Sequence, residues 1–555
     1  MNSVFTFLLL MSCGIISAQE TLIFDSIHYP LKTPITLSGT FGEIRSNHFH
    51  SGIDIKTGGI QGEAVYSIYD GYVSRVKVSG TGFGKAIYID HPNGTTSVYA
   101  HLKNFNKAIT EYVKSMQYAN QTFEIDLYPN PNRITLEKGD FIAYSGNSGS
   151  SEGPHLHFEI RDSKTQIPRN PLNYNINITD NIKPIINSLC VYGANKEKQC
   201  VDVINSDLNY YIKDTIFTDS LVSFSVETYD KHNYTPNKNG IYSIKLFVDD
   251  SLIHYRVMDS FSFSETRYVN SLIDYQQKDC CNKIMQKCFL DERNNLNIYN
   301  NLKNGWTTFL DTLIHEVKFI ICDKNNNCSE LLCYVKAKNR KLKNVVPQGI
   351  YIESNKIQQL SFNEVELYFP YNCFYNNFYF EFSKENYKGE LLSPIYNIHN
   401  TSVPVHQYYI LSLNLDVNFN LKHKITLAKV NSNDKIIYMG GSWSNNTFIT
   451  KLNTFGKFAL TFDTIPPIIK PQNIYNGKNM KENTVISFKI FDDFSGINNY
   501  RAEVDGKWIL MEYDPKNSKL VYYFDEKIEK GKHSLTLHVT DKLNNASVYK
   551  AEFIR

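Results

Sequence analysis

Two short histidine-containing stretches, far apart in the chain, restrict most strongly what this sequence can fold into. The first has the form His50-x-x-x-Asp54 and the second His155-x-His157. Both stretches are predicted to lie in strands, where side chains return to the same face at every second residue. His50 would then share a face with Asp54, and His155 with His157. If the two strands pair side by side, two imidazoles and a carboxylate converge on one point.

Such a ligand set is typical of a catalytic metal site. Two histidines and one carboxylate, with a fourth position left to water, bind zinc in several hydrolases. A single histidine on a strand is far more often a packed or exposed side chain than a ligand, so the prediction depends on the combination. Glycines accompany both stretches, and close backbone packing around a site often requires them; they are Gly52, Gly146, Gly149 and Gly153.

Three motifs together resemble the lysostaphin/LytM-type zinc metalloendopeptidases. They are His50-x-Gly52-x-Asp54, Tyr99-Ala100-His101-Leu102, and Gly146-Asn147-Ser148-Gly149 followed by Gly153-Pro154-His155-Leu156-His157-Phe158-Glu159. They stand in the family's order within about residues 35–162. The resemblance implies the family's β fold, the duplicated hybrid motif. It also implies zinc ligands at His50, Asp54 and His157, and catalytic histidines at His101 and His155.

The activity that this resemblance implies is hydrolysis of peptide bonds in peptidoglycan stem peptides or cross-bridges. A zinc-activated water would attack the peptide, with His101 and His155 assisting and the choice of general base left open between them. One alternative is a non-catalytic envelope protein that binds cell wall or activates an amidase. Another is an adhesin in which the later β modules do the main work. A D-alanyl-D-alanine carboxypeptidase is disfavoured, because the family it would resemble places more residues between the first histidine and the aspartate.

Around these motifs the pattern predicts short strands separated by turns. The expected strands are Ile35–Phe41, Val65–Ile68, Gly71–Val78, Lys85–Asp90 and Thr95–Ala100, with a hairpin turn at His91-Pro92-Asn93-Gly94. His91 is assigned to that turn and His48 is left out of the metal shell. Glu43 and Arg45 either orient the ligands or form an ordinary salt bridge. Apolar residues at positions 109, 112, 113 and 116 predict a helix that either walls a substrate groove or is a surface excursion.

The rest of the chain contains a repeat. Asp180–Ile186 matches Asp463–Ile469, Gly240-Ile241 with Val248-Asp249 resembles Gly496-Ile497 with Val504-Asp505, and His315–Asp323 aligns with His533–Asp541 without a gap. Three matches in one order predict two copies of one domain type. Strand alternation with Asp, Asn and Gly turns favours immunoglobulin-like sandwiches. The equivalent positions of His315 and His533 favour a structural role for both.

The length of 555 residues predicts several domains, and 14% aromatic residues suit a mostly β fold. We expect a signal peptide at 1–18, an antiparallel zinc metallopeptidase domain at 19–178, an Ig-like β domain with an insertion at 179–340, a β-rich domain of uncertain fold at 341–462 and a second Ig-like domain at 463–555. The insertion is expected near residues 255–300. The C-terminal β domains are candidates for contacts with cell-envelope proteins or for spacers.

The apolar segment at residues 4–17 and the Ile16-Ser17-Ala18 cleavage pattern predict export to the periplasm, envelope or medium. Lipidation at Cys13 is the alternative. No later stretch is apolar enough to span a bilayer, and a net charge of +2 gives no sign of nucleic acid.

Cysteine usage fits an oxidising compartment. Nine of the ten cysteines follow the predicted signal peptide, so at least one should remain unpaired within the chain. Cys322 and Cys328 flank a turn and are predicted to bridge. Further candidates are Cys190, Cys200, Cys280, Cys281 and Cys288.

Overall fold

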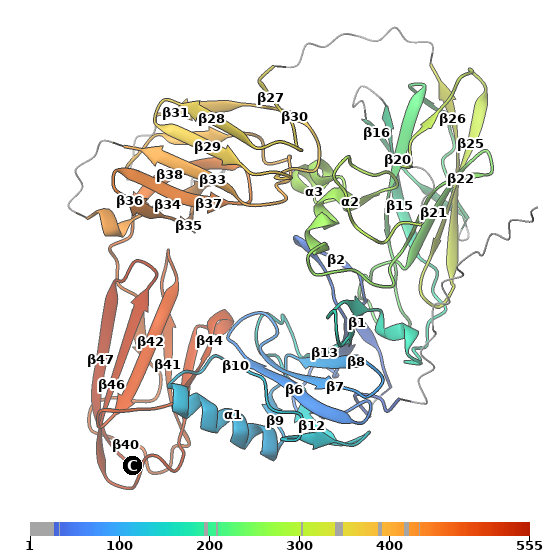
Figure 1. The fold of residues 1–555 in the computed structure, drawn as a ribbon. Helices are drawn as coiled ribbons and strands as arrows, with labels where there is room; N and C mark the ends of the chain where they lie inside the picture. Colours follow the sequence, from blue (N-terminus) through green and yellow to red (C-terminus); the bar gives the residue numbers. More distant parts are fainter. Residues whose placement is uncertain are drawn as a thin grey trace, which may run out of the picture.

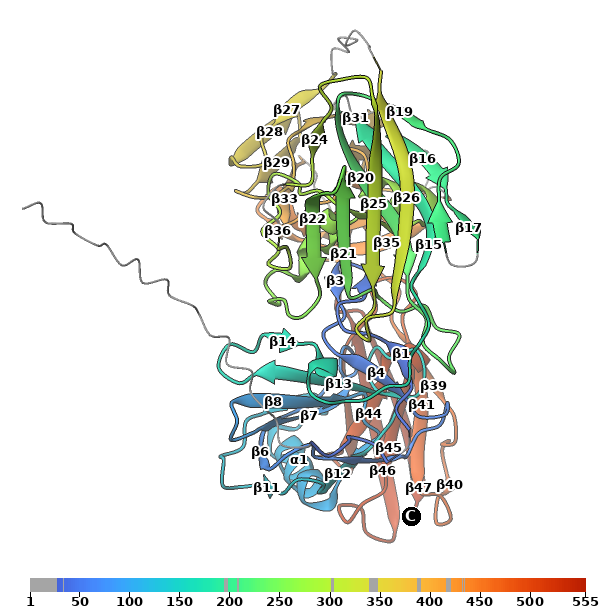
Figure 2. The same cartoon turned by 90° about the vertical axis from the view of Figure 1, so that its right-hand side faces the viewer.

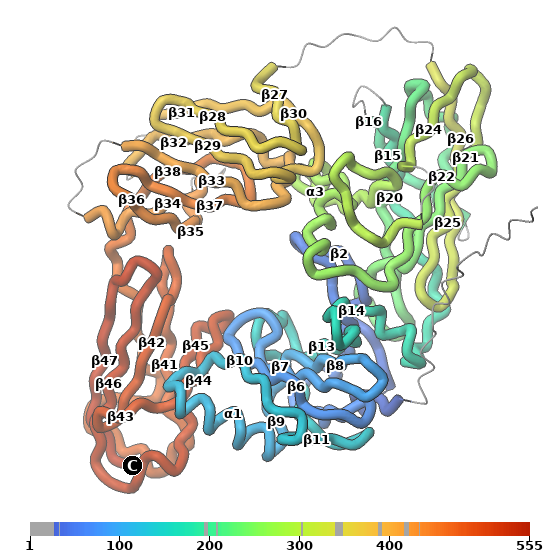
Figure 3. Tube along the Cα trace, in the orientation of Figure 1, coloured from blue at the N-terminus to red at the C-terminus, as the bar shows by residue number. Residues whose placement is uncertain are grey.

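The structure is a computed structural model of the chain. It describes residues 27–32, 34–193, 198–206, 209–300, 304–338, 348–386, 391–415, 421–431, 433 and 435–555. The predicted signal peptide at 1–18, including Cys13, lies outside the described residues. Four β-rich parts follow one another around a ring, and the C-terminal part returns to the N-terminal one (Figure 1). Figure 2 shows them in two tiers, and Figure 3 traces the path of the chain between them.

The first part is built on one antiparallel sheet, as predicted. Its order is β1 (Leu37–Gly39), β4 (Ile53–Lys56), β13 (His155–Asp162), β8 (Thr95–Ala100), β7 (Lys85–Asp90), β6 (Gly71–Val78) and β10 (Ile125–Leu127). At its margins β11 (Thr135–Leu136) pairs with β6 and β14 (Pro168–Arg169) with β13. Three predicted strands, β6, β7 and β8, have the expected bounds. The hairpin turn between β7 and β8 is also where the sequence predicted it.

The core of this part lies on one face of the sheet. A small sheet covers that face, formed by β5 (Ala64–Tyr66), β12 (Phe141–Tyr144) and β9 (Asn104–Phe105), together with α1 (Lys107–Asn120). In β13 the residues Leu156, Phe158 and Ile160 enter the core. Strand periodicity therefore turns His155 and His157 to the opposite face. The predicted helix is present as α1, and Ile109 and Val113 are buried in the same core.

One strand prediction near the site is wrong. His50 does not lie in a strand, because β3 (His48–Phe49) forms a short hairpin with β2 (Ile44–Arg45) and the chain turns again before β4. The His50 amide donates to the Glu43 carbonyl oxygen and its carbonyl oxygen accepts from the Gly42 amide. A Cβ at Gly52 would lie 2.3 Å from the Phe158 carbonyl oxygen. Glycine is therefore required where this turn crosses β13.

The second part contains two facing sheets that share one core. One sheet comprises β16 (Lys198–Asp202), β15 (Ile185–Gly193), β20 (Leu221–Tyr229), β23 (Met285–Lys287) and β24 (Thr307–Thr308). The other comprises β17 (Ile204–Ser206), β18 (Asn209–Tyr211), β26 (Cys328–Ala337), β25 (Ile314–Cys322), β21 (Ser243–Val248), β22 (Ser251–Val257) and β19 (Ile216–Thr218). We call this part the first sandwich.

An insertion after β22 carries η2 (Thr266–Tyr268), α2 (Val269–Leu272) and α3 (Tyr275–Cys281). Its Met258, Phe261 and Leu272 form one buried cluster with Phe41 and Phe49 of the first part. The insertion therefore connects the two parts through apolar packing as well as through the chain.

The third part also has two facing sheets around a shared core. One sheet comprises β28 (Gln358–Phe362), β29 (Val365–Phe369), β33 (Tyr409–Asn414), β37 (Thr447–Leu452) and β36 (Ser442–Ser444). The other comprises β31 (Phe382–Glu385), β32 (Ile395–Ile398), β38 (Gly456–Phe462), β34 (Ile425–Val430) and β35 (Ile436–Gly440). A separate pair joins β27 (Ile350–Ile352) to β30 (Phe378–Phe380), and η3 spans Lys422–Lys424.

The C-terminal part, here the last sandwich, is the most compact of the four. One sheet comprises β39 (Ile468–Pro471), β41 (Val485–Phe491), β45 (Lys519–Tyr523) and β44 (Met511–Asp514). The other comprises β40 (Lys478–Asn479), β47 (Ala546–Ile554), β46 (Lys532–Asp541), β42 (Ile497–Val504) and β43 (Lys507–Trp508), and η4 spans Pro515–Asn517.

His315 and His533 make the same contact in the two sandwiches. The Nδ1 atom of His315 lies 2.6 Å from Asp249 Oδ2, and that of His533 lies 2.7 Å from Asp505 Oδ2.

The predicted disulfide joins Cys322 to Cys328 at opposed positions of β25 and β26. A second joins Cys190 to Cys200 across β15 and β16, and a third links the neighbours Cys280 and Cys281. Cys288, predicted as a candidate for pairing, is a buried thiol, as are Cys333 and Cys373. Within the described ranges, no helix combines the length and apolarity needed to cross a membrane.

Candidate metal centre

Strand pairing assembles the centre from three segments of the chain. β13 pairs with β4 in the register that places His157 opposite Asp54. On its other side β13 pairs with β8, and His157 lies opposite Ala100. His101, the next residue after β8, therefore reaches the level of His157. Its φ of 59° is in the left-handed region, which marks the point where the chain leaves the strand.

Three side-chain atoms form a nearly equilateral triangle. His50 Nε2, Asp54 Oδ1 and His157 Nδ1 lie 3.0 Å from one another along each side. All three residues are buried. Tetrahedral zinc with bonds of about 2.0–2.2 Å separates its ligand atoms by roughly 3.3–3.6 Å. The triangle is therefore close to one face of such a tetrahedron, and two nitrogens with one oxygen suit zinc.

The non-coordinating nitrogen of His157 has a strong partner. His157 Nε2 lies 2.9 Å from Glu159 Oε1, and Glu159 also accepts from Ser51 and from Arg161. Burial alone would raise the pKa of Glu159, but Arg161 and His157 lower it to about 2. The carboxylate therefore stays charged and holds a hydrogen on His157 Nε2, so Nδ1 is the nitrogen that faces the triangle.

Protonation and metal binding compete at His157. Burial lowers the pKa of this imidazole, but Asp54 and Glu159 outweigh that effect and raise it to about 9. The same nitrogen that would bind a metal thus holds a proton at neutral pH. Three histidines, His50, His155 and His157, hold the pKa of Asp54 well below its usual range in spite of its burial. The carboxylate is therefore ionised and ready to bind a cation.

The remaining two ligands are also oriented by neighbours. His50 Nδ1 lies 2.8 Å from the Thr40 carbonyl oxygen, so Nε2 faces the triangle. Arg45 lies between two carboxylates, with Nη2 3.4 Å from Asp54 Oδ2 and Nε 3.0 Å from Glu43 Oε1. The two roles considered for Glu43 and Arg45 are thus combined in one salt-bridged pair that contacts a ligand.

His101 and His155 lie beside the triangle in matching environments. His101 Nδ1 contacts the Ser148 carbonyl oxygen at 2.9 Å, and His155 Nδ1 contacts the Gly153 carbonyl oxygen at 2.8 Å. Each Nδ1 therefore carries hydrogen and leaves Nε2 as the basic atom. His155 Nε2 is 3.3 Å from Asp54 Oδ1. The ring centroids of His101 and His155 are 4.9 Å apart. Burial and the neighbouring histidines lower the pKa of His101 to about 3, so this imidazole is neutral at pH 7.

Two other histidines of this part lie outside the cluster. His48 is exposed and contacts the Ser46 carbonyl oxygen. His91 is buried in the hairpin turn and contacts the Asp70 carbonyl oxygen and Ser97. The sequence assigned neither to the metal shell.

Sequence reasoning gave no role to Glu159, Arg161, Ser51 or Thr40. Glu159 and Arg161 stand two and four residues after His157 in β13, so they share its face of the strand. This spacing could have indicated from the sequence that they lie near the metal ligands.

The last sandwich reaches the loop that orients both flanking histidines. Lys516 Nζ lies against the carbonyl oxygens of Asn147 and Ser151, the second at 2.8 Å. A cavity of about 850 Å³ lies between this sandwich and the first part, and residues of α1 line it. Ser148 and Gly149 from the same loop border the cavity.

Comparison with known proteins identifies the class of this site. Residues 48–120 match Peptidase family M23, and residues 350–463 match a Zu5-like domain. The chain thus contains a domain of the M23 metallopeptidase family. The second match lies almost entirely in the third part, whose fold the sequence left open.

Two groups of curated relatives match part of this chain. An uncharacterized metalloprotease of Haemophilus influenzae is 31% identical over 147 residues, which are 25% of this chain and 26% of the relative. The DD-carboxypeptidase/endopeptidase Mpg of Neisseria meningitidis serogroup B is 31% identical over 112 residues, 20% of each chain. This chain therefore spans about a quarter or less of the length of these relatives.

Solved structures match a similar share of the chain. The catalytic domain of lysostaphin from Staphylococcus simulans is 21% identical, with 24% of this chain and 86% of that chain covered and a TM-score of 0.18. The catalytic domain of the M23 protein EnpA from Enterococcus faecalis is 21% identical, with 27% and 97% covered and a TM-score of 0.20.

Proposed function

We propose that the protein is a zinc-dependent metalloendopeptidase that hydrolyses peptide bonds in peptidoglycan stem peptides or cross-bridges. The observation that carries this proposal is the 3.0 Å triangle of His50 Nε2, Asp54 Oδ1 and His157 Nδ1 with two further histidines beside it. We assign the triangle as the zinc ligands, and His101 and His155 as catalytic residues. The M23 match over residues 48–120 supports the assignments of His50, Asp54 and His101, which lie within it.

The chain's own residues prepare the site for peptide hydrolysis. When bound, zinc supplies a Lewis acid and lowers the pKa of a coordinated water to about 7. His101 and His155 present their Nε2 atoms to the same side, because backbone carbonyl oxygens hold both Nδ1 atoms. One neutral imidazole accepts the proton of the attacking water at Nε2 and, as the imidazolium so formed, donates a hydrogen bond to the oxygen of the scissile carbonyl or delivers that proton to the departing amine. The similar placement of His101 and His155 leaves open which of them acts as this base.

The cavity beside α1 lies next to the loop that orients the flanking histidines, but none of the proposed ligands or catalytic histidines lines it. It is bordered by Ser148, whose carbonyl oxygen orients His101, and by Lys85, Glu512 and Lys516 at the junction with the last sandwich. A substrate in this cavity would contact charged groups from both parts. The helix α1 therefore lines a cavity at this junction, and both roles considered for it stay open.

A second activity is favoured by the names of the Neisseria relatives, which combine DD-carboxypeptidase and endopeptidase. The same ligand set would serve a carboxypeptidase if the groove accepts a terminal D-alanine. The non-catalytic alternative, an envelope protein that binds wall or activates an amidase, would need neither His101 nor His155 poised beside a metal site.

One digest distinguishes these activities. Purified full-length protein loaded with zinc is incubated with purified sacculi, and the released fragments are identified by mass spectrometry. An endopeptidase converts cross-linked muropeptides to monomers or opens stem peptides, whereas a carboxypeptidase releases free D-alanine. The His157→Ala variant is the control for contaminating hydrolases. Unchanged sacculi with the folded, zinc-loaded protein would contradict the proposal.

We also propose export to the cell envelope, the five-segment division given above and an immunoglobulin-like fold for the two sandwiches. Peptidoglycan lies outside the cytoplasm, so the proposed substrate requires export. The β domains are candidates for binding envelope proteins. Fractionation of producing cells tests the location, and protein retained in the cytoplasm would contradict it.

A further inference from the structure

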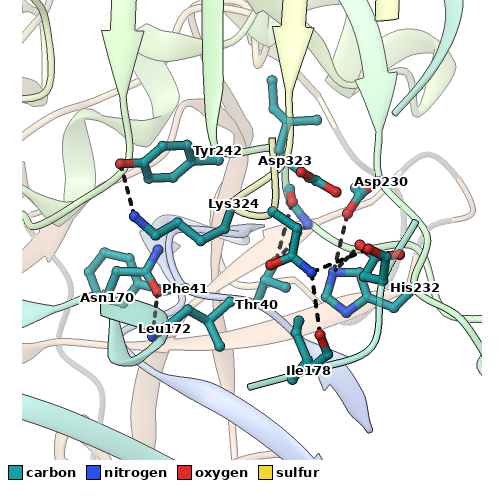
Figure 4. A pocket seen from close by; sticks show the side chains of 14 residues that line it. Thr40, Phe41, Asn170, Leu172, Ile178, Asp230, His232, Tyr242, Asp323 and Lys324 are labelled. Carbon is teal, nitrogen blue, oxygen red and sulfur yellow. Dashed lines mark hydrogen bonds and ion pairs between the residues drawn. The ribbon is translucent and has the colours of Figure 1, made fainter. Parts of the chain in front are cut away.

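A cluster of acidic side chains lies where the first part meets the first sandwich (Figure 4). Asp180 from the linker, Asp230 after β20 and His232 place ligand atoms within 4.8 Å of one another, and Asp323 after β25 lines the same cavity. His232 Nε2 lies 3.2 Å from Asp230 Oδ2 and 3.7 Å from Asp180 Oδ2. Thr40, Phe41 and Asn170 of the first part line the same cavity. The cluster therefore sits at a junction between two parts.

The last sandwich carries an equivalent cluster at its own junction with the third part. Its members are Asp463, Asp492 and Asp541, whose ligand atoms lie within 4.8 Å of one another. Strand register establishes the equivalence. Asp230 follows the partner of Ile185 in the β15–β20 pair, and Asp492 follows the partner of Ile468 in the β39–β41 pair. Asp180 and Asp463 each stand five residues before these isoleucines.

The surrounding hydrogen bonds repeat in detail. Asn327 donates from its side chain to Asp323 Oδ2 at 2.7 Å and to the Asp180 carbonyl oxygen at 3.2 Å. Asn545 does the same with Asp541 Oδ2 at 2.6 Å and the Asp463 carbonyl oxygen at 3.0 Å. Each asparagine thus fixes two of the aspartates relative to each other.

The carboxylates in these clusters are poorly compensated. Asp230 is fully buried; its Oδ2 forms an ion pair with His232 Nε2 at 3.2 Å, whereas its Oδ1 accepts no hydrogen bond. Oδ2 of Asp463, a residue that is only 5% exposed, also accepts none. In the first cluster His232 pairs with Asp230 and Asp180, and these carboxylates raise its pKa in spite of its burial. Among the residues that the structure describes, no lysine or arginine forms an ion pair with any of the six aspartates, and the second cluster has no such histidine. Burial and the neighbouring Asp180 raise the pKa of Asp323 to about 6. A buried carboxylate without such a partner costs several kcal/mol unless a cation balances it.

We propose that each sandwich binds one calcium ion, one at Asp180, Asp230 and Asp323 and the other at Asp463, Asp492 and Asp541. Oxygen donors select hard cations, and calcium accepts several carboxylates in flexible geometry, whereas magnesium retains most of its water. The second cluster contains no imidazole, so it is a poor site for zinc. The two ions would attach the linker before each sandwich to the loops at the end of that sandwich. They would thereby set the angle between consecutive parts of the ring.

Equilibrium dialysis of the full-length protein with radioactive calcium tests the proposal. The peptidase centre is filled with one equivalent of zinc, and free calcium is 1 mM, about the upper end of the dissociation constants of extracellular calcium modules. We expect two calcium ions per chain. Asp230→Asn and Asp463→Asn should each lose one ion, and the double variant both. Asp250→Asn and Asp493→Asn, which remove the same charge at exposed positions, should keep two.

Thermal unfolding separates loss of a ligand from misfolding. Without calcium, Asp230→Asn and Asp463→Asn should unfold at the same temperature as wild type or higher, because each removes repulsion between carboxylates. With calcium, both should unfold at a lower temperature than wild type. Absence of bound calcium in wild type, binding unchanged in both variants, or equal occupancy by magnesium at the same concentration would overturn the proposal. A single ion, lost in only one variant, would overturn it for the other sandwich.

Discussion

The peptidase centre and the aspartate clusters are both buried groups of charged side chains, but they are completed in opposite ways. At the peptidase centre, every ligand has a neighbour that fixes its orientation: Thr40 for His50, Arg45 for Asp54 and Glu159 for His157. In the clusters of the sandwiches, carboxylate oxygens such as Asp230 Oδ1 and Asp463 Oδ2 have no hydrogen bonds. The first arrangement is rigid before a metal arrives. The second has charge that a metal would balance.

The donor atoms explain this difference. Two imidazole nitrogens with one carboxylate oxygen suit zinc and leave a position for water, which is the requirement for catalysis. Three carboxylates suit a hard cation that is enclosed by oxygen, which is the requirement for a structural link. The peptidase centre also has two imidazoles beside it that are not ligands, His101 and His155, whereas the first aspartate cluster has one, His232, which is ion-paired with the aspartates. Chemistry is therefore expected there and not in the sandwiches.

Removing a ligand should have the largest effect. His157→Ala leaves two ligands, which cannot close a tetrahedral site, so we expect loss of both zinc and hydrolysis. Elemental analysis and cleavage of a cross-linked muropeptide measure the two losses. His48→Ala, at an exposed histidine outside the cluster, should keep one zinc and full activity. Stoichiometric zinc in His157→Ala would show that the ligand assignment is wrong.

The two flanking histidines should affect turnover without affecting the metal. General acid–base catalysis contributes about 10²–10⁴-fold, so His101→Ala and His155→Ala should each lose activity within that range and still bind one zinc. Turnover and zinc content are measured on the same preparation. Near-normal turnover in both variants would mean that the histidines only pack beside the centre.

Zinc affinity should depend steeply on pH. His157 has a pKa raised to about 9 in the metal-free protein, so between pH 6 and 8 the bound proton must leave when zinc binds. The dissociation constant should fall roughly tenfold for each unit of increasing pH, or about 100-fold over this range. Competition with a zinc chelator at pH 6, 7 and 8 measures it. A constant affinity would contradict the competition at Nδ1.

Glu159→Gln should have a smaller effect on the same centre. The amide keeps an acceptor for His157 Nε2 but removes the charge, and changes to such partners typically cost about 10–100-fold in metal affinity. Chelator competition at pH 7 compares it with Glu137→Gln at an exposed position. Glu159→Asp, which keeps the charge beside Arg161, controls for loss of folding. Unchanged affinity in Glu159→Gln would mean that the carboxylate serves only the packing of Arg161.

Much of the peptidase sheet could be predicted from local patterns. Alternation and the Asn93-Gly94 turn located β7 and β8, because strand period and positive φ are properties of a few neighbouring residues. The conformation around His50 could not be predicted in this way. It depends on the β2–β3 hairpin and on the close passage of Gly52 over Phe158, which are contacts between distant segments. The motif nevertheless located the ligands, because the hairpin turn brings His50 back to Asp54.

The aspartate clusters show the complementary case. Asp180 and Asp323 and their counterparts Asp463 and Asp541 stood inside the repeated motifs, but nothing in the sequence placed them together. Asp230 and Asp492 lay outside those motifs. Only the ends of β20 and β41 bring them to the same point. Repetition therefore indicated two copies of a domain, whereas folding was needed to reveal a charge cluster in each.

The most direct test of the zinc peptidase assignment is a zinc titration of activity. Full-length protein is stripped of metal, checked for folding, and titrated with zinc while cleavage of a soluble cross-linked muropeptide is followed. Activity should rise in proportion to zinc and stop rising at one ion per chain. His101→Ala should take up the same zinc without comparable cleavage. Full activity without metal, or a folded chain with one zinc that cleaves no peptide bond, would contradict the account.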